Sequence, residues 1–81
     1  MSKTEITLEY PVTVDGIETK TLSMRRPKVR DMLASEKKAT TDAEKEIGVF
    51  ANLCEVSPKA IEELDMMDYG KLQEAYQNFL S

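Results

Sequence analysis

Residues 22–33, LSMRRPKVRDML, mark the point where the chain changes from a strand pattern to a helix pattern. Before Pro27, apolar and polar side chains alternate, whereas the apolar residues after it recur at intervals of three and four. Proline is favoured in the first turn of a helix, because its fixed φ suits the helix and its missing N–H is not needed there. This stretch therefore predicts a β part before it and a helical part after it.

The β part is predicted to be a hairpin over residues 5–24, because alternating apolar residues flank the Asp-Gly turn signal at residues 15–16. A two-residue turn would place the apolar residues of the second strand on the polar face. We therefore prefer a three-residue loop, which pairs Leu8 with Leu22 and Ile6 with Met24. The apolar face predicted to lie on the core consists of Ile6, Leu8, Tyr10, Leu22 and Met24.

Residues 27–80 predict a cluster of about four short-to-medium helices. Thr41 and Glu44 have the spacing of a capping box, Ser57 precedes a proline, and Asp65 can cap the last helix. The second and fourth helices are expected to cover the apolar face of the hairpin. The sequence thus predicts an α+β class and a single domain over residues 1–81.

Composition excludes several classes of function. The chain has no histidine, a single cysteine and three dispersed glycines, so it lacks the usual general base, a zinc ligand set and a phosphate-binding loop. We expect no enzyme activity, no catalytic, cofactor-binding or metal-binding residues, and no cofactor. No apolar run is long enough to span a membrane and no signal peptide is recognisable, which predicts a cytoplasmic protein. Cys54 is expected to be a small buried hydrophobe.

Positive charge gathers around the strand-to-helix junction, in a chain whose net charge is −4. Arg25, Arg26, Lys28 and Arg30 are candidate partner-binding residues, because a charged patch of this kind steers association. The alternative is that the two arginines are solvated or pair with nearby carboxylates such as Asp31. Cations near a helix N-terminus also oppose the helix dipole, so something must offset that cost.

A second group of candidates is apolar. Adjacent Met66 and Met67 cannot both face the core, so at least one is expected to offer an adaptable apolar surface. Tyr76, Phe79 and Leu80 end the apolar face of the last helix and either pack on the second helix or stay partly exposed for a helical partner.

The order of these features resembles a phage family. The hairpin with its Val-Asp-Gly turn is followed by a set of segments that together carry the resemblance, from about Ile6 to Leu80. They are MRRPKVRD at residues 24–31, FANLC at 50–54, SP at 57–58, IEELD at 61–65 and DYGKLQEA at 68–75. The pattern is similar to the small tail assembly chaperones of long, contractile-tailed bacteriophages and related prophages, although no single motif is diagnostic.

The resemblance implies a non-catalytic protein of the host bacterial cytoplasm that is absent from the finished virion. Family members bind the tape measure protein, keep it soluble and help to recruit tail tube subunits. Many also exist as a longer form made by ribosomal frameshifting, and Phe79-Leu80 can be encoded by a slippery run of uridines. The resemblance implies no nucleic-acid or membrane partner.

Two other functions remain open at this point. A small phage-encoded nucleic-acid-binding regulator would use the basic junction to contact phosphates, although a pI near 4.8 disfavours it. A minor structural component of the tail is the other possibility. The sequence leaves the oligomeric state open.

Overall fold

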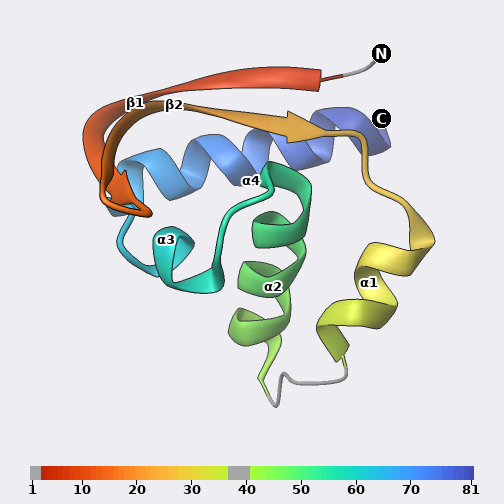
Figure 1. Cartoon of the computed structure of the whole chain (residues 1–81). Coiled ribbons are helices and arrows are strands. Elements are labelled where there is room, and N and C mark those ends of the chain that lie inside the picture. The colour runs from red at the N-terminus through yellow and green to blue at the C-terminus, as the bar shows by residue number, and fades with distance from the viewer. Residues whose placement is uncertain (1–2, 37–40) are drawn as a thin grey trace.

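The computed structural model describes residues 3–36 and 41–81, in which an antiparallel hairpin is followed by four helices (Figure 1). The predicted α+β class is therefore confirmed. No helix in these two segments is both long and apolar enough to cross a membrane. The elements are β1 (Lys3–Val14), β2 (Ile17–Arg25), α1 (Val29–Glu36), α2 (Asp42–Cys54), α3 (Pro58–Glu62) and α4 (Met66–Leu80).

The helices lie on one side of the hairpin, with α2 against β2, α4 against β1 and α1 against α2 (Figure 1). The second and fourth helices thus cover the hairpin as the sequence predicts. The core lies between them, and burial of each large apolar side chain there contributes about 1.5–3 kcal/mol. Its most deeply buried apolar side chains are Met24, Phe50, Leu53, Ile61 and Leu72.

The hairpin turn has two residues, so the predicted three-residue loop is wrong. Val14 pairs with Ile17 across the turn. Asp15 has φ 52° and Gly16 has φ 79°, the two left-handed positions that a type I′ turn requires. This turn matches the twist of the strands, and the Asp-Gly dipeptide favours it for that reason.

The pairing then shifts in the middle of the strands. Val12 lies opposite Thr19 but Thr7 lies opposite Thr21, so β1 advances by five residues while β2 advances by two. β1 therefore has three more residues than β2 between these two pairs. Because three is an odd number and side chains alternate between the two faces, the apolar residues of β2 beyond this point lie on the core face. The parity problem that favoured a longer loop is therefore solved by an irregularity within β1.

This irregularity also corrects two predictions about individual residues. Ile6 lies opposite Leu22, so the predicted pairs of Leu8 with Leu22 and of Ile6 with Met24 are wrong. Tyr10 was predicted in the core, but it is 56% exposed. It lies in the irregular segment, where the alternation of inward and outward side chains is interrupted.

Asp68 holds this irregular segment against the first turn of α4. Its carboxylate accepts hydrogen bonds from the backbone N–H groups of Glu9 (2.9 Å) and Tyr10 (3.0 Å). The Lys71 ammonium lies 3.4 Å from the same carboxylate and donates to the carbonyl oxygen of Thr7 at 2.8 Å. Burial acts to raise the pKa of Asp68, but the two amides and Lys71 together hold it below its ordinary value.

Three helices begin at the predicted caps. The Thr41 hydroxyl accepts a hydrogen bond from the Glu44 N–H at 3.1 Å, and the Glu44 carboxylate accepts one from the Thr41 N–H at 3.2 Å. Ser57 and Asp65 likewise accept hydrogen bonds from backbone N–H groups in the first turns of α3 and α4. Each cap of this kind contributes about 1 kcal/mol.

Candidate partner-binding surface

Arg25 is committed to the internal structure of the junction. Its guanidinium forms a two-pronged ion pair with Asp31, with nitrogen–oxygen distances of 2.6 and 3.0 Å. Asp31 also accepts a hydrogen bond from the backbone N–H of Lys28 at 2.8 Å, which caps the start of α1. Hydrogen bonding by Arg25 lowers the pKa of Asp31 in spite of its burial. This negative charge offsets the dipole cost of the surrounding cations.

The other three cations of the junction have exposed side chains. The Arg26 guanidinium lies over the ring of Phe79, with 5.8 Å between its central carbon and the ring centroid. This cation–π contact joins the junction to the last turn of α4. Lys28 and Arg30 extend from the start of α1 into solvent, where they are available for a partner.

The apolar stripe of α1 faces solvent. Val29, Met32 and Leu33 are 73%, 51% and 58% exposed, although their spacing places them on one side of the helix. The apolar spacing after the junction predicts a helix from Pro27 to about Lys37. The observed helix begins at Val29, and Lys37 lies outside the described residues. Together with Arg26, Lys28 and Arg30, these three residues form what we call the basic face.

Sequence reasoning recognised the charges of the basic face but not its apolar centre. An amphipathic pattern shows that a helix has an apolar side, but it does not show whether that side meets the core or a partner. Arg30 lies directly beside Val29, but cations also border apolar stripes that pack on a core, so the local pattern carried no signal for exposure.

The predicted site residues at the end of α4 divide into packed and exposed ones. The Tyr76 ring lies 5.6 Å from the Phe50 ring, centroid to centroid, and packs on the core in half-buried form. Phe79 is also half-buried and holds Arg26. Leu80 is 59% exposed. Of these three predicted residues, Leu80 has the largest exposed fraction.

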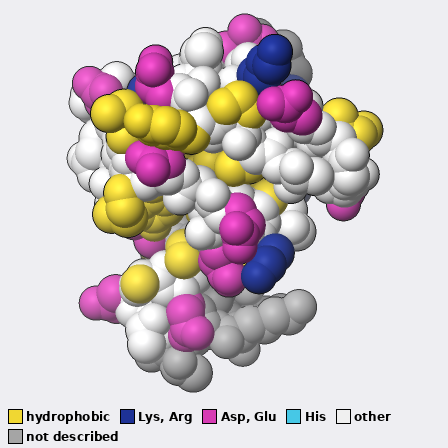
Figure 2. All heavy atoms as spheres, turned by 90° about the vertical axis from the view of Figure 1, so that its left-hand side faces the viewer, with side chains coloured by type: hydrophobic (Ala, Val, Ile, Leu, Met, Phe, Trp, Pro, Cys, Tyr) yellow, Lys and Arg dark blue, Asp and Glu magenta, His cyan; other side chains and the backbone are white. Residues whose placement is uncertain are grey.

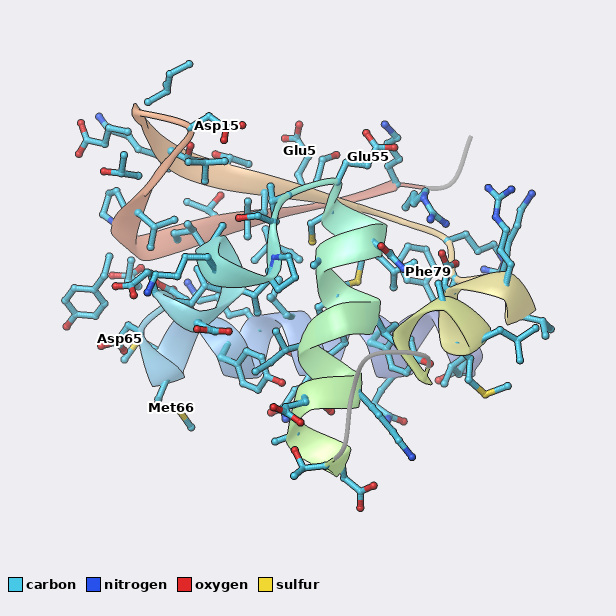
Figure 3. The ribbon with its side chains drawn as sticks, turned by 60° about the horizontal axis from the view of Figure 1, so that its bottom comes forward. Glu5, Asp15, Glu55, Asp65, Met66 and Phe79 are labelled. Carbon is cyan, nitrogen blue, oxygen red and sulfur yellow. The ribbon has the colours of Figure 1, made fainter. Side chains whose placement is uncertain are left out.

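Met66 and Met67 lie at the opposite end of the molecule. Figure 3 shows Met66 and Phe79 at the two ends of α4, a helix of 15 residues and hence about 22 Å long. Met66 is 79% exposed and Met67 is 57% exposed. The sequence-predicted residues therefore do not form one site, because the methionines are separated from the basic junction by the length of α4.

Two aspartates flank these methionines in the chain, Asp65 at the cap of α4 and Asp68 in its first turn. Tyr10 lies next to the first turn of α4, because its N–H is bonded to Asp68 there. Figure 2 shows this side of the molecule, on which hydrophobic and acidic side chains intermingle and Lys and Arg are sparse. We call this surface the acidic end. Its apolar residues are Tyr10, Met66 and Met67, and its exposed carboxylates are Glu9, whose N–H is bonded to Asp68, and Asp65, which caps α4.

The described residues provide little for chemistry. In residues 3–36 and 41–81, no group of three His, Cys, Asp or Glu side chains could hold a metal ion. Cys54 is buried, and burial raises the pKa of its thiol to about 11, so it stays protonated at neutral pH.

Comparison with known proteins places this arrangement in a family. The family model described as "Phage tail assembly chaperone proteins, E, or 41 or 14" matches residues 5–81. No curated protein and no solved structure matches the chain. The family match spans the hairpin, the junction and all the helices described above, and it agrees with the resemblance that the sequence carries. The chain belongs to the phage tail assembly chaperone family.

Proposed function

We propose that this protein binds the tape measure protein of its phage, keeps it soluble during tail assembly and helps to recruit tail tube subunits. The observation that carries the proposal is the basic face, in which exposed apolar side chains of α1 are bordered by exposed cations on a member of a tail assembly chaperone family. A long helical client exposes amphipathic segments before the tube encloses it, and such segments bind apolar surfaces of this kind.

The two components of the basic face have separate tasks in this proposal. Val29 and Leu33, which are four residues apart on one side of α1, take the apolar side of a client helix. Lys28 and Arg30 attract acidic side chains of the client and raise the rate of encounter. A longer product, made by frameshifting near Phe79-Leu80, would add a segment next to this face and could recruit tube subunits there.

Co-expression with the tape measure protein of the same phage tests the proposal. We expect the soluble fraction of the client to rise with the chain present, and to fall by about tenfold with Leu33→Asp, because a charge then replaces an apolar contact. Ile17→Asp is the matched control, since Ile17 is 69% exposed at the hairpin turn, away from α1. A client that is equally soluble without the chaperone would contradict the proposal.

A further inference from the structure

Both exposed surfaces of the molecule bury a carboxylate and leave apolar side chains in solvent. In α1 the buried side chain is Asp31, at 3% exposure, whereas the apolar stripe faces outward. In the first turn of α4 the buried side chain is Asp68, at 0% exposure, whereas Met66 and Met67 face outward. Burial of the apolar residues would favour folding more than burial of a carboxylate does, so their exposure indicates that both surfaces serve binding.

The proposed function uses the basic face and assigns no role to the acidic end. We propose that the acidic end is a second client-binding surface, which takes a basic amphipathic segment of the client while the basic face takes an acidic one. This inference rests on the proposed function, because both segments belong to the same client.

The apolar part of the acidic end combines two distant segments of the chain. Tyr10, which is 56% exposed, is held beside the first turn of α4 because the Asp68 carboxylate accepts its N–H at 3.0 Å. Met66 and Met67 are 79% and 57% exposed on that turn. The backbone under the patch is thus fixed by hydrogen bonds, while the unbranched methionine side chains adapt to the shape of a partner. Such a patch suits the apolar side of an amphipathic helix.

The charge of the acidic end selects a basic segment. Its carboxylates are Glu9, whose side chain is 63% exposed, the exposed Asp65 and the buried Asp68. Among the ion pairs of the described residues, only Lys71 contacts them, 3.9 Å from Glu9 and 3.4 Å from Asp68. The N-terminus of α4 adds about half a positive charge, so negative charge stays in excess. Residues 25–31 carry a net +3 in a chain of net −4, so the rest carries −7 and also attracts cations.

The two surfaces are far enough apart to hold two different segments at once. They lie at opposite ends of α4, a helix of 15 residues and hence about 22 Å long. A helical client rises about 1.5 Å per residue, so segments whose centres are about 15 residues apart can reach both surfaces of one copy. Once one segment is bound, the effective concentration of the other is high. Two weak contacts therefore give a stable complex with a long client whose segments differ in charge.

Two designed peptides test the two surfaces separately. Each has about 18 residues, leucines spaced to give one apolar side and one tryptophan, and the remaining positions are lysine in the first and glutamate in the second. The chain has no tryptophan, so peptide fluorescence reports binding without a background from the protein. We expect the lysine peptide to bind the acidic end and the glutamate peptide to bind the basic face, each more tightly at about 0.01 M than at about 1 M salt.

Met66→Lys locates the binding of the lysine peptide. The variant replaces an exposed apolar contact by a like charge, so the dissociation constant of the lysine peptide should rise at least about tenfold, whereas that of the glutamate peptide should not rise. Leu80→Lys is the matched control and should leave the lysine peptide bound, because Leu80 is 59% exposed at the other end of the same helix. Circular dichroism checks that both variants are folded.

Asp65→Asn tests the contribution of charge, because asparagine keeps the helix cap and removes the negative charge. It should weaken binding of the lysine peptide about threefold at low salt. Asp42→Asn makes the same change at the start of α2 and should have no effect. A tape measure fragment that contains both kinds of segment should lose affinity with Met66→Lys and with Leu33→Asp.

A lysine peptide that does not bind at about 1 mM and low salt, or that binds Met66→Lys and Leu80→Lys equally well, would overturn the inference. The proposed function would still stand in that case if client solubility depended on Leu33. A second copy of the chain over the acidic end would appear as an average mass above 9.2 kDa that Met66→Lys lowers, with no peptide bound, and would also overturn the inference. Binding of the lysine peptide at the acidic end, in a chain that leaves client solubility unchanged, would support this surface and contradict the proposed function.

Discussion

Two buried carboxylates, Asp31 and Asp68, perform similar tasks in different parts of the molecule. Asp31 accepts a hydrogen bond from one backbone N–H group and Asp68 from two, and each lies against one cation, Arg25 for the first and Lys71 for the second. They differ in reach. Asp31 bonds residues three and six positions away, whereas Asp68 bonds residues 58 and 59 positions away. Asp31 therefore organises a local turn, and Asp68 joins the hairpin to α4.

This difference in sequence separation shows how each of the two surfaces is held in place. The Asp31 cluster fixes the start of α1 and thus the direction of the basic face, without joining distant segments. The Asp68 cluster fixes the irregular segment of β1 against α4 and thus brings Tyr10 beside the methionines of the acidic end. The Asp31 contacts are local in the sequence, whereas the Asp68 contacts join the hairpin to the last helix.

The largest expected effect comes from Asp68→Asn. The substituted amide keeps the shape of the side chain, but its NH₂ group faces a donor and it carries no charge for Lys71. Asp68 is 0% exposed, so water cannot replace the lost acceptor, and we expect a loss of about 3–5 kcal/mol in the free energy of unfolding. Urea denaturation followed by circular dichroism measures it.

Asp65→Asn is the matched control for that variant. It makes the same chemical change at an exposed helix cap three residues earlier, where asparagine caps as well as aspartate. Equal losses in the two variants would show that Asp68 does not anchor the hairpin.

Asp31→Asn should have a smaller effect, about 1–3 kcal/mol, because the paired Arg25 side chain is 23% exposed and can turn toward water. The loss should be local. Hydrogen exchange should increase at the start of α1 and stay unchanged in β1 and α4, whereas Asp68→Asn should increase exchange in both strands. Increased exchange across the hairpin in Asp31→Asn would contradict the proposed difference in reach.

The same difference decides what could be predicted from sequence. A carboxylate partner for the junction arginines could be foreseen, because Asp31 follows Arg25 by only six residues. The role of Asp68 could not be foreseen. Its partners are backbone N–H groups that an irregularity in a distant strand leaves without a partner in the other strand. One signal was available: Pro11 cannot donate a ladder hydrogen bond, and proline in a strand often marks a bulge.

The overall class and the helix starts were predictable because they depend on short-range chemistry. The Thr41 capping box needs residues only three positions apart, and it forms as predicted. The hairpin register depends instead on how parity is restored along the whole strand, and both the turn length and the burial of Tyr10 were wrong for that reason. Whether the α1 stripe faces solvent depends on packing, which the local pattern does not contain.

The smallest effect at neutral pH is expected for Lys71→Met. The Lys71 side chain is 35% exposed, so its ion pair and its bond to Thr7 contribute about 0.5–1 kcal/mol. The contribution of Lys71 to stability should be clearer at acid pH. Asp68 has a lowered pKa in the folded protein, so it contributes stability that is present above its unfolded pKa of about 3.9 and is lost as pH falls through the folded value.

Removal of Lys71 takes away one of the groups that lower the pKa of Asp68, so the folded value rises and stability is lost at a higher pH. Urea midpoints measured from about pH 2 to about pH 7 should show this shift for Lys71→Met. Lys59→Met is the control, because its partner Glu63 is exposed and 3.5 Å away. If both variants kept the acid profile of the unmodified chain, Lys71 would be a surface contact only, and the Asp68 cluster would consist of the carboxylate and its two amides.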